Sequence, residues 1–449
     1  MKVKSRKTEP GILPVPPKLL SGLARLAVFL PALCVAMRAS AQPSMDLAAC
    51  LAAAEKNSPQ MRIADNAARA ASLVRSELST TALPQVQAIM DAIYLPVPPR
   101  YGYDPAITDG GEVRGMLSVR QSLYDSGVRG LRMEQADADV ERVGHERRQA
   151  SLDVALAVTQ AFFDAIRARE ESALQAESVD ELETYRVLVD RLHRGGIASA
   201  TDLLKTELQV STARIALAKA VEAEHGATIA LEELIGLPPD TSLVLQGSLA
   251  ASPSGADTTL PAAVDPEATV DMTIAGMLVT RSMLDEDISR HERLPDISLF
   301  ADAGYLSSGD NLRLPTSERL NGLGYEVGIG IQFPILNWGA TGYRTEQREV
   351  TTDDLRNRQE LLRRSIVADA ARLRLELSGA RRRLLMLRTD LDRARDNFVL
   401  TKSKYAAGAS LALEVLSAEQ TMIDARSAQI ETLADIRVLT AKLNRLNAH

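Results

Sequence analysis

Histidine and cysteine are the residue types whose spacing would first reveal catalytic or metal chemistry. The chain has five histidines, and none forms an HExxH pair or joins a Cys/His cluster of the kind that holds zinc. They lie apart, mostly beside charged residues in segments expected to be helical: His145, His193, His225, His291 and His449. We therefore expect solvated helix surface at these positions, with no catalytic residue, no cofactor, no metal site and no enzyme activity.

The two cysteines exclude a disulfide scaffold. Cys34 falls inside a predicted export signal, so Cys50 is the single cysteine of the exported chain. The segment ending at Cys50 (Leu-Ala-Ala-Cys) has the form of a lipoprotein cleavage box, but Asp46 and the polar stretch 38–44 separate it from the apolar part of the signal. We expect a buried helical cysteine rather than a lipidated one.

Residues 1–41 have the pattern of a secretory signal peptide. Basic residues such as Lys2 and Lys4 precede an apolar stretch from Leu26 to Met37, and Ala39-Ser40-Ala41 forms a cleavage site. The alternative is a buried N-terminal helix. Cleavage removes seven Lys/Arg and one Glu, which leaves 45 basic and 58 acidic residues and a net charge of −13. That charge disfavours nucleic-acid partners.

Proline placement predicts very long helices in this chain of 449 residues. No proline occurs between Pro105 and Pro238 or after Pro334, and a proline inside a helix costs roughly 3 kcal/mol. Helices of about 65 residues would be about 100 Å long, which is typical of a rod or coiled coil. No stretch of the body reaches about 20 uninterrupted apolar residues, so a polytopic helical membrane protein is excluded.

The chain also repeats one plan twice, at a constant offset of 211 or 212 residues. Leu83-Pro84 corresponds to Leu294-Pro295, residues 122–127 (SLYDSG) to 334–339 (PILNWG), and the turn after Gly196 to the turn after Gly408. We predict an internal duplication in which each unit is helix, two strands, long helix, tight turn and helix. The predicted boundaries are 42–246 for the first repeat, 247–266 for a linker and 267–449 for the second repeat.

Each repeat contains two segments in which apolar and polar residues alternate, predicted as strands at about 84–96, 112–124, 294–306 and 323–336. This alternation is typical of outer-membrane barrel strands, and equally of a half-buried soluble sheet. The export signal and the aromatic residues at the strand ends favour the membrane, where such residues form an interfacial girdle. The predicted girdle is Tyr94, Tyr305, Tyr325, Phe333 and Trp338.

Four strands are too few to close a barrel, for which eight is the usual minimum. The chain must therefore oligomerise, and three copies would supply twelve strands. Heptad-like spacing also predicts seams for helix pairing on both sides of the first turn. These seams are Leu182, Tyr185, Val189 and Leu192 before it, and Leu204, Leu208, Ser211, Ile215 and Ala218 after it.

The long helices are expected to fold back at glycine-containing tips, at about 194–202 and 406–414. Ser199, Thr201 or Asp202 can cap the helix after the first tip, and Ser410 the helix after the second.

The ordered recurrence of these strand-to-helix junctions and tips resembles the outer-membrane efflux protein family, the TolC-like channels, over the whole mature chain. The resemblance implies a mainly α fold with β: a homotrimer whose 12-stranded outer-membrane β-barrel continues into a periplasmic α-helical coiled-coil barrel. It also implies an exit channel of a tripartite efflux pump or type I secretion system, with outer-membrane lipid around the barrel. The implied partners are a periplasmic adaptor protein and an inner-membrane transporter of the RND or ABC type.

The resemblance also carries residue roles. The implied adaptor-docking residues are Arg194, Gly195, Gly196, Ile197, Ala198, Ser199, Gly408, Ala409 and Leu411. The implied periplasmic gate residues are Glu414, Ser417, Tyr405, Asp202 and Ser410. Glu414 matches the first of two acidic rings, whereas Ser417 and Ser410 stand where an acidic and a basic residue would be, which suggests a singly acidic entrance that favours cations. The alternative role for Glu414 is a solvated carboxylate stabilised by the helix dipole.

Two other functions compete with an exit channel. A periplasmic coiled-coil adaptor (membrane fusion) protein of an efflux system would also have long hairpins, but usually one, inserted in a β-domain. A structural coiled-coil protein of the cell surface would have no use for two strand pairs with aromatic ends. The sequence names neither the transported substrate nor the transporter, and it leaves drug efflux, protein export and metal export open.

Overall fold

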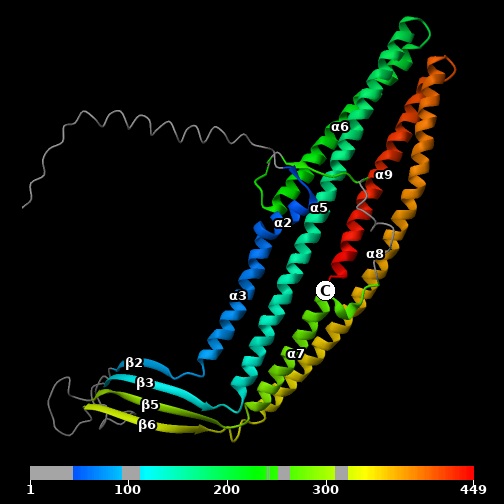
Figure 1. Ribbon diagram of the computed structural model, residues 1–449. Coiled ribbons are helices and arrows are strands. Elements are labelled where there is room, and N and C mark those ends of the chain that lie inside the picture. The colour runs from blue at the N-terminus through cyan, green and yellow to red at the C-terminus, as the bar shows by residue number, and fades with distance from the viewer. Residues whose placement is uncertain are drawn as a thin grey trace, which may run out of the picture.

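The computed structural model describes residues 44–93, 112–239, 241, 243–250, 263–308 and 322–448 of the chain. The expected signal peptide, Tyr94, His449 and most of the expected linker lie outside the described residues. One end of the molecule is a small sheet, and the other end is the paired tips of two long helical hairpins (Figure 1). None of the described helices is both long enough and apolar enough to cross a membrane.

The sheet has four antiparallel strands in the order β2-β3-β5-β6: Gln85–Ile93, Glu112–Tyr124, Asp296–Ser308 and Gly322–Gln332. The register lines up the apolar residues of all four strands, for example Val86, Val119, Ala301 and Val327 in one row. Because side chains alternate along a strand, one face of the sheet is apolar throughout and the other is mostly polar. The last strand ends before Phe333, earlier than the expected 336, and Pro334 has no N–H to extend the ladder.

Two helices of 67 residues form the length of the molecule, α5 (Val128–Arg194) and α8 (Ala340–Ala406). Each is about 100 Å long at 1.5 Å per residue. Each folds back into a shorter helix, α6 (Ala200–Ile235) and α9 (Ala412–Leu446). The helices α3 (Pro59–Thr80) and α7 (Val270–His291) lead into the sheet and pack beside α5 and α8 (Figure 1).

The connections from sheet to long helix share one unusual backbone. Ser126 and Trp338 have φ of 56° and 53°, and the glycines that follow, Gly127 and Gly339, have φ of 83° and 84°. Two successive left-handed residues turn the chain sharply from strand to helix. Such a conformation suits glycine and strains other residues.

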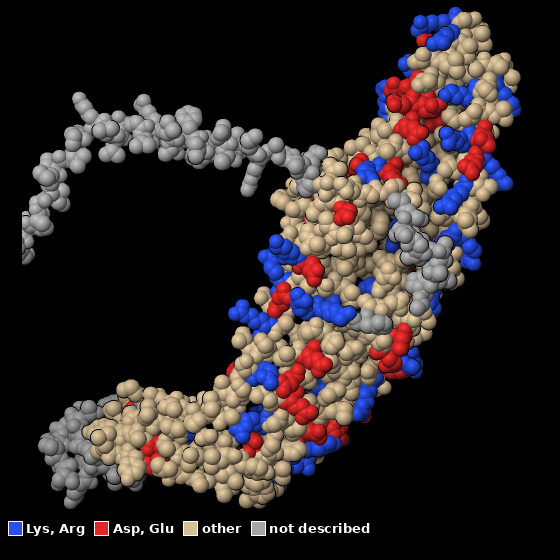
Figure 2. All heavy atoms as spheres, in the orientation of Figure 1, with Lys and Arg blue, Asp and Glu red and all other residues tan. Residues whose placement is uncertain are grey.

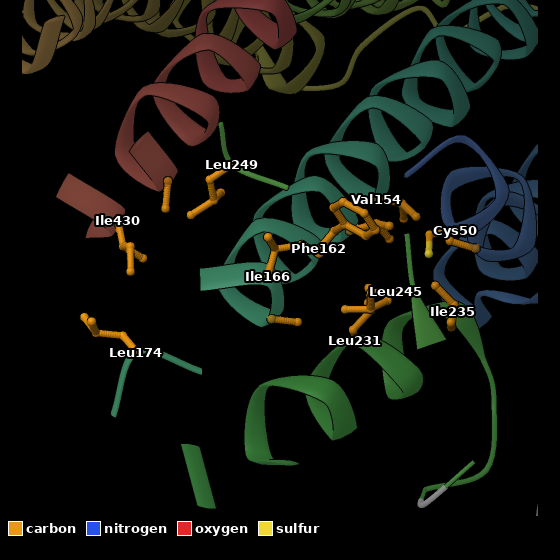
Figure 3. Packing of buried hydrophobic residues seen from close by; sticks show 14 of the residues in the cluster. Cys50, Val154, Phe162, Ile166, Leu174, Leu231, Ile235, Leu245, Leu249 and Ile430 are labelled. Carbon is orange, nitrogen blue, oxygen red and sulfur yellow. The ribbon is translucent and has the colours of Figure 1, made fainter. Parts of the chain in front are cut away.

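The largest core cluster lies midway along the helices, where α2 (Leu47–Asn57), α5, α6 and α9 meet (Figure 3). Phe162, Leu231 and Cys50 are buried there. Two short strands, β1 (Ser44–Met45) and β4 (Val244–Leu245), pair in parallel beside this cluster, and the one-turn helix η1 (Pro266–Ala268) precedes α7. Burial raises the pKa of the Cys50 thiol to about 11, which keeps it protonated, as a core residue should be.

One expected seam packs within the chain and the other does not. Leu182, Tyr185 and Val189 of α5 are buried. On α6 the chain instead buries Thr206 and Val210, and it leaves a stripe of Leu204, Leu208 and Ile215 more than half exposed. The heptad spacing on α6 therefore does not mark packing inside one chain.

Candidate functional site

The tip of the first hairpin is closed by its own backbone. Gly196 is left-handed at φ 72°, and the N–H groups of Ile197 and Ala198 donate to the carbonyl of Leu192 at 2.9 and 3.2 Å. This turn projects the Ile197 side chain, which is 69% exposed. Arg194 is also exposed and pairs with Asp190 in the preceding turn at 2.6 Å. The first tip thus presents one apolar and one cationic side chain to solvent.

Asp202 holds the start of α6 as the second half of a capping box. The backbone N–H of Asp202 donates to Ser199 Oγ at 3.1 Å, and the Ser199 N–H and hydroxyl both donate to the Asp202 carboxylate. Ser199 is therefore the capping residue among the three candidates. The Asp202 carboxylate hydrogen-bonds within its own tip.

The tip of the second hairpin repeats this turn with different capping. Gly408 is left-handed at φ 75°, and Leu411, 67% exposed, projects into solvent. The N-cap residue of α9 is Leu411, so the expectation that Ser410 caps this helix is wrong. Ser410 lies one residue earlier, and its hydroxyl donates to the Glu414 carboxylate instead.

Glu414 lies in the first turn of α9 and is exposed in the single chain. The hydrogen bond from Ser410, together with one from the Leu411 N–H at 3.4 Å, holds the pKa of Glu414 below its ordinary value. The carboxylate is therefore ionised at neutral pH. Ser417, one turn further along α9, is exposed on the same face.

Tyr405 lies just below the second tip and is buried against the first hairpin. Its ring packs on Tyr185 of α5, with centroids 5.4 Å apart. Burial, and then the charge of Asp202, raise the pKa of Tyr405, so its hydroxyl stays neutral. The charge of Asp202 in the first hairpin therefore acts on Tyr405 in the second. The sequence did not identify Tyr185 as a site residue. Its heptad position predicted only that it packs against another helix.

Several polar contacts below the tips join α5 to the second hairpin. Ser178 donates to Glu419 of α9 at 2.5 Å, and both side chains are buried. Lys402 of α8 pairs with Glu181, and Arg426 of α9 pairs with Glu177. Sequence reasoning missed Ser178 and Glu419, since a lone glutamate in a helix full of charged residues gives no sign of burial.

The described aromatic residues of the expected girdle lie at the two ends of the apolar sheet face. Tyr305 and Tyr325 are near the loop end, whereas Phe333 and Trp338 are near the helix end. Tyr325 and Trp338 are each 85% exposed. The eight residue steps from Tyr325 to Phe333 span about 26 Å if extended, close to the apolar band of about 25 Å on outer-membrane barrels. Charged side chains are sparse over this sheet and dense over the helices (Figure 2).

Comparison with known proteins decides the family. The sequence profile described as "Outer membrane efflux protein" matches residues 50–237 and 284–447, which is most of the chain. The chain belongs to the outer membrane efflux protein family. The resemblance predicted from the sequence is therefore confirmed, and with it the expectation of an outer-membrane efflux protein.

Individual members of the family agree with this assignment. The chain is 26% identical over 318 residues to the pyoverdine export outer membrane protein OpmQ of Pseudomonas aeruginosa, covering 70% of this chain but only 63% of OpmQ. It is 24% identical over 348 residues to the alkaline protease secretion protein AprF of the same organism, covering 71% and 69% of the two chains. The outer membrane protein VceC of Vibrio cholerae shares the fold, with a TM-score of 0.73, 16% identity and coverage of 90% and 96%.

Proposed function

We propose that this protein is the outer-membrane exit channel of a tripartite efflux pump or a type I secretion system, working as a homotrimer without catalytic activity. The observation that carries the proposal is the four-stranded sheet at the end of two hairpins about 100 Å long. Its apolar face is exposed, and among the described residues the outer edges of β2 and β6 pair with no further strand.

Three copies are proposed because the four-stranded sheet of one chain cannot close into a barrel by itself. A strand edge inside a membrane leaves backbone groups without partners, so a spanning sheet must close on itself. Three copies place β6 of one beside β2 of the next and form a barrel of twelve strands. The exposed apolar side chains of Met90, Leu323, Tyr325 and Val327 would then face lipid, with the aromatic girdle at both interfaces.

The helices support the same assembly. The α6 stripe of Leu204, Leu208 and Ile215 is exposed in one chain and has the spacing of a helix-pairing seam. We infer that this stripe packs against a neighbouring copy in a periplasmic helical barrel. The duplicated boundaries, with repeats at 42–246 and 267–449 joined by a linker at 247–266, fit a barrel in which every copy contributes two similar hairpins.

The tips would dock a periplasmic adaptor protein, which in turn binds an inner-membrane transporter of the RND or ABC type. Ile197 and Leu411 are the exposed apolar anchors, and Arg194 is an exposed cation beside them. Glu414 and Ser417 would face the constriction, with the contact between Tyr405 and Tyr185 holding the two hairpins together behind it and Asp202 fixing the first tip. OpmQ is named for pyoverdine export and AprF for alkaline protease secretion, so channels similar to this chain carry a small compound in one case and a protein in the other.

Fractionation of cells that produce the full chain tests this proposal. The expected result is a heat-modifiable band of three times the chain mass in the outer-membrane fraction. A monomer in the soluble periplasmic extract would contradict the proposal and favour a periplasmic adaptor. Pull-down with a candidate adaptor, with Ile197→Asp against the nearby Val187→Asp as control, then tests the docking surface.

A further inference from the structure

One row of the polar sheet face gathers two carboxylates and two neutral oxygen donors. The strand register places Gln87 opposite Ser118, Ser118 opposite Asp302, and Asp302 opposite Glu326. Residues directly opposite each other on neighbouring strands have Cβ atoms about 5 Å apart. The row therefore runs across all four strands at a single level of the sheet.

Two members of this row are buried without satisfying their polar atoms. Asp302 is 8% exposed and Ser118 is 1% exposed. Neither the buried Oδ1 of Asp302 nor the Ser118 hydroxyl has a hydrogen-bond partner among the described residues. An ionised carboxylate buried without a partner is strongly unfavourable, so such a group calls for a proton or a counterion.

Two arginines lie near this row on the same face of the sheet. Arg114 lies two rows away on the same face and is paired with Asp91 at 2.6 Å. Arg120 lies on the adjacent row, and among the described residues no ion pair joins it to Asp302 or Glu326. The two carboxylates are directly opposite each other and therefore repel one another, and neither takes part in an ion pair among the described residues.

We propose that Asp302 and Glu326, with the Ser118 hydroxyl that stands beside Asp302, form a binding site for a divalent cation, Ca²⁺ in particular. Carboxylate and hydroxyl oxygens are ligands that hard divalent cations take, and Ca²⁺ accepts them in flexible geometry. A single copy supplies only two carboxylates, so the ion keeps several water molecules. The site is an exchangeable counterion site rather than a structural metal centre.

This inference rests on the proposed function for its location. In a closed trimer the polar face lines the lumen, and three-fold symmetry repeats the Asp302–Glu326 pair around it as a ring. The ring then carries six carboxylates at one level. Bound Ca²⁺ would neutralise it, and without the ion the ring would favour cations in the barrel lumen.

Equilibrium dialysis of the full-length protein in detergent against radioactive CaCl₂ tests the site. All variants carry Glu414→Ala, which removes the acidic position proposed at the tips. We expect Asp302→Asn and Glu326→Gln each to raise the Kd for Ca²⁺ at least about tenfold, the scale on which lost metal-site partners act. The matched control is Asp296→Asn, which removes a carboxylate from the same face of the same strand about 20 Å away and should leave binding unchanged.

The outcomes separate this inference from the proposed function. Because Glu326 is exposed, Glu326→Gln keeps the test informative even if Asp302→Asn fails to fold. Trimers that bind Ca²⁺ equally with and without both carboxylates would overturn the cation site and leave the channel intact. A protein that never forms trimers would overturn the channel and, with it, the ring.

Discussion

The rings of Tyr185 and Tyr405 pack against each other with their centroids 5.4 Å apart and their planes inclined by 58°. Tyr185 belongs to α5 and Tyr405 to the last turn of α8, so this contact joins the two hairpins directly below their tips. Both side chains are buried, and burial raises the pKa of each. Neutral, buried rings are insensitive to ordinary changes of pH, which suits a permanent contact behind an entrance.

Tyr405→Ala should loosen this contact. Removing a buried aromatic side chain costs about 3–5 kcal/mol, and here the cost falls on the contact between hairpins. We expect a larger mean conductance in planar bilayers and faster proteolysis at the tips. Tyr405→Phe keeps the ring and should behave almost as the parent. If the Ala and Phe variants conduct alike, the tyrosine pair does not restrain the entrance.

Glu419→Gln should stabilise the helical part of the protein at neutral pH. Burial raises the pKa of Glu419, although the hydrogen bond from Ser178 opposes the shift. The folded state therefore holds this proton more tightly than the unfolded state, and the parent loses stability as pH rises from the ordinary carboxyl range through the raised pKa. The glutamine keeps an acceptor for Ser178 and carries no charge.

The measurement is the thermal unfolding of parent and Glu419→Gln trimers by circular dichroism at acid and neutral pH. We expect equal midpoints in acid and a gain of about 1–3 kcal/mol for the variant at neutral pH. The negative charges of Glu181 and Asp424 raise the pKa of Glu419 further. The two cations of the neighbouring polar contacts, Lys402 and Arg426, are paired with Glu181 and Glu177 rather than with Glu419. A variant less stable than the parent at neutral pH would show that the buried carboxylate is favourable.

Gly339→Ala should destabilise the second strand-to-helix junction. Gly339 is left-handed at φ 84°, a conformation that costs other residues roughly 1–2 kcal/mol. Gly342, three residues further on, lies inside α8 with an ordinary helical backbone. Gly342→Ala is therefore the matched control, and it should stabilise the helix by about 0.5–1 kcal/mol. Equal effects of the two substitutions on the unfolding midpoint would contradict this assignment of the junction.

Glu414→Ala should relieve block by divalent cations added on the side of the helical tips. The hydrogen bond from Ser410 lowers the pKa of Glu414, so the carboxylate stays ionised and the block should fade only as pH falls below the ordinary glutamate range. Cations added on the opposite side test the barrel site separately. Unchanged block from the tip side in bilayer recordings would remove Glu414 from the constriction.

The sequence was most informative where one physical constraint acts alone. Alternation with a period of two requires that Val86 and Val327 lie on one face, and the observed register places both in one row. Absence of proline allowed α5 and α8 to run uninterrupted for 67 residues each. Both features depend on local backbone chemistry, and single-chain reasoning captures that chemistry well.

The sequence did not predict features that arise where two helices contact each other. Glu419 is a charged residue in a polar helix, and only the approach of Ser178 from α5 buries it. The cap expected at Ser410 is a local error instead, because α9 begins one residue later than expected and its N-cap residue is Leu411. The seam at Leu204 and Leu208 could be predicted but its partner could not, because spacing reveals that a helix packs and not which helix it meets.

Single-channel recording of the purified full-length protein in planar lipid bilayers tests the central claim most directly. The account predicts discrete, long-lived conductance steps from a species with the mass of three chains, with a larger conductance for Tyr405→Ala. A protein that inserts no conductance and stays monomeric after extraction would contradict the assignment of the four-stranded sheet to a trimeric membrane barrel.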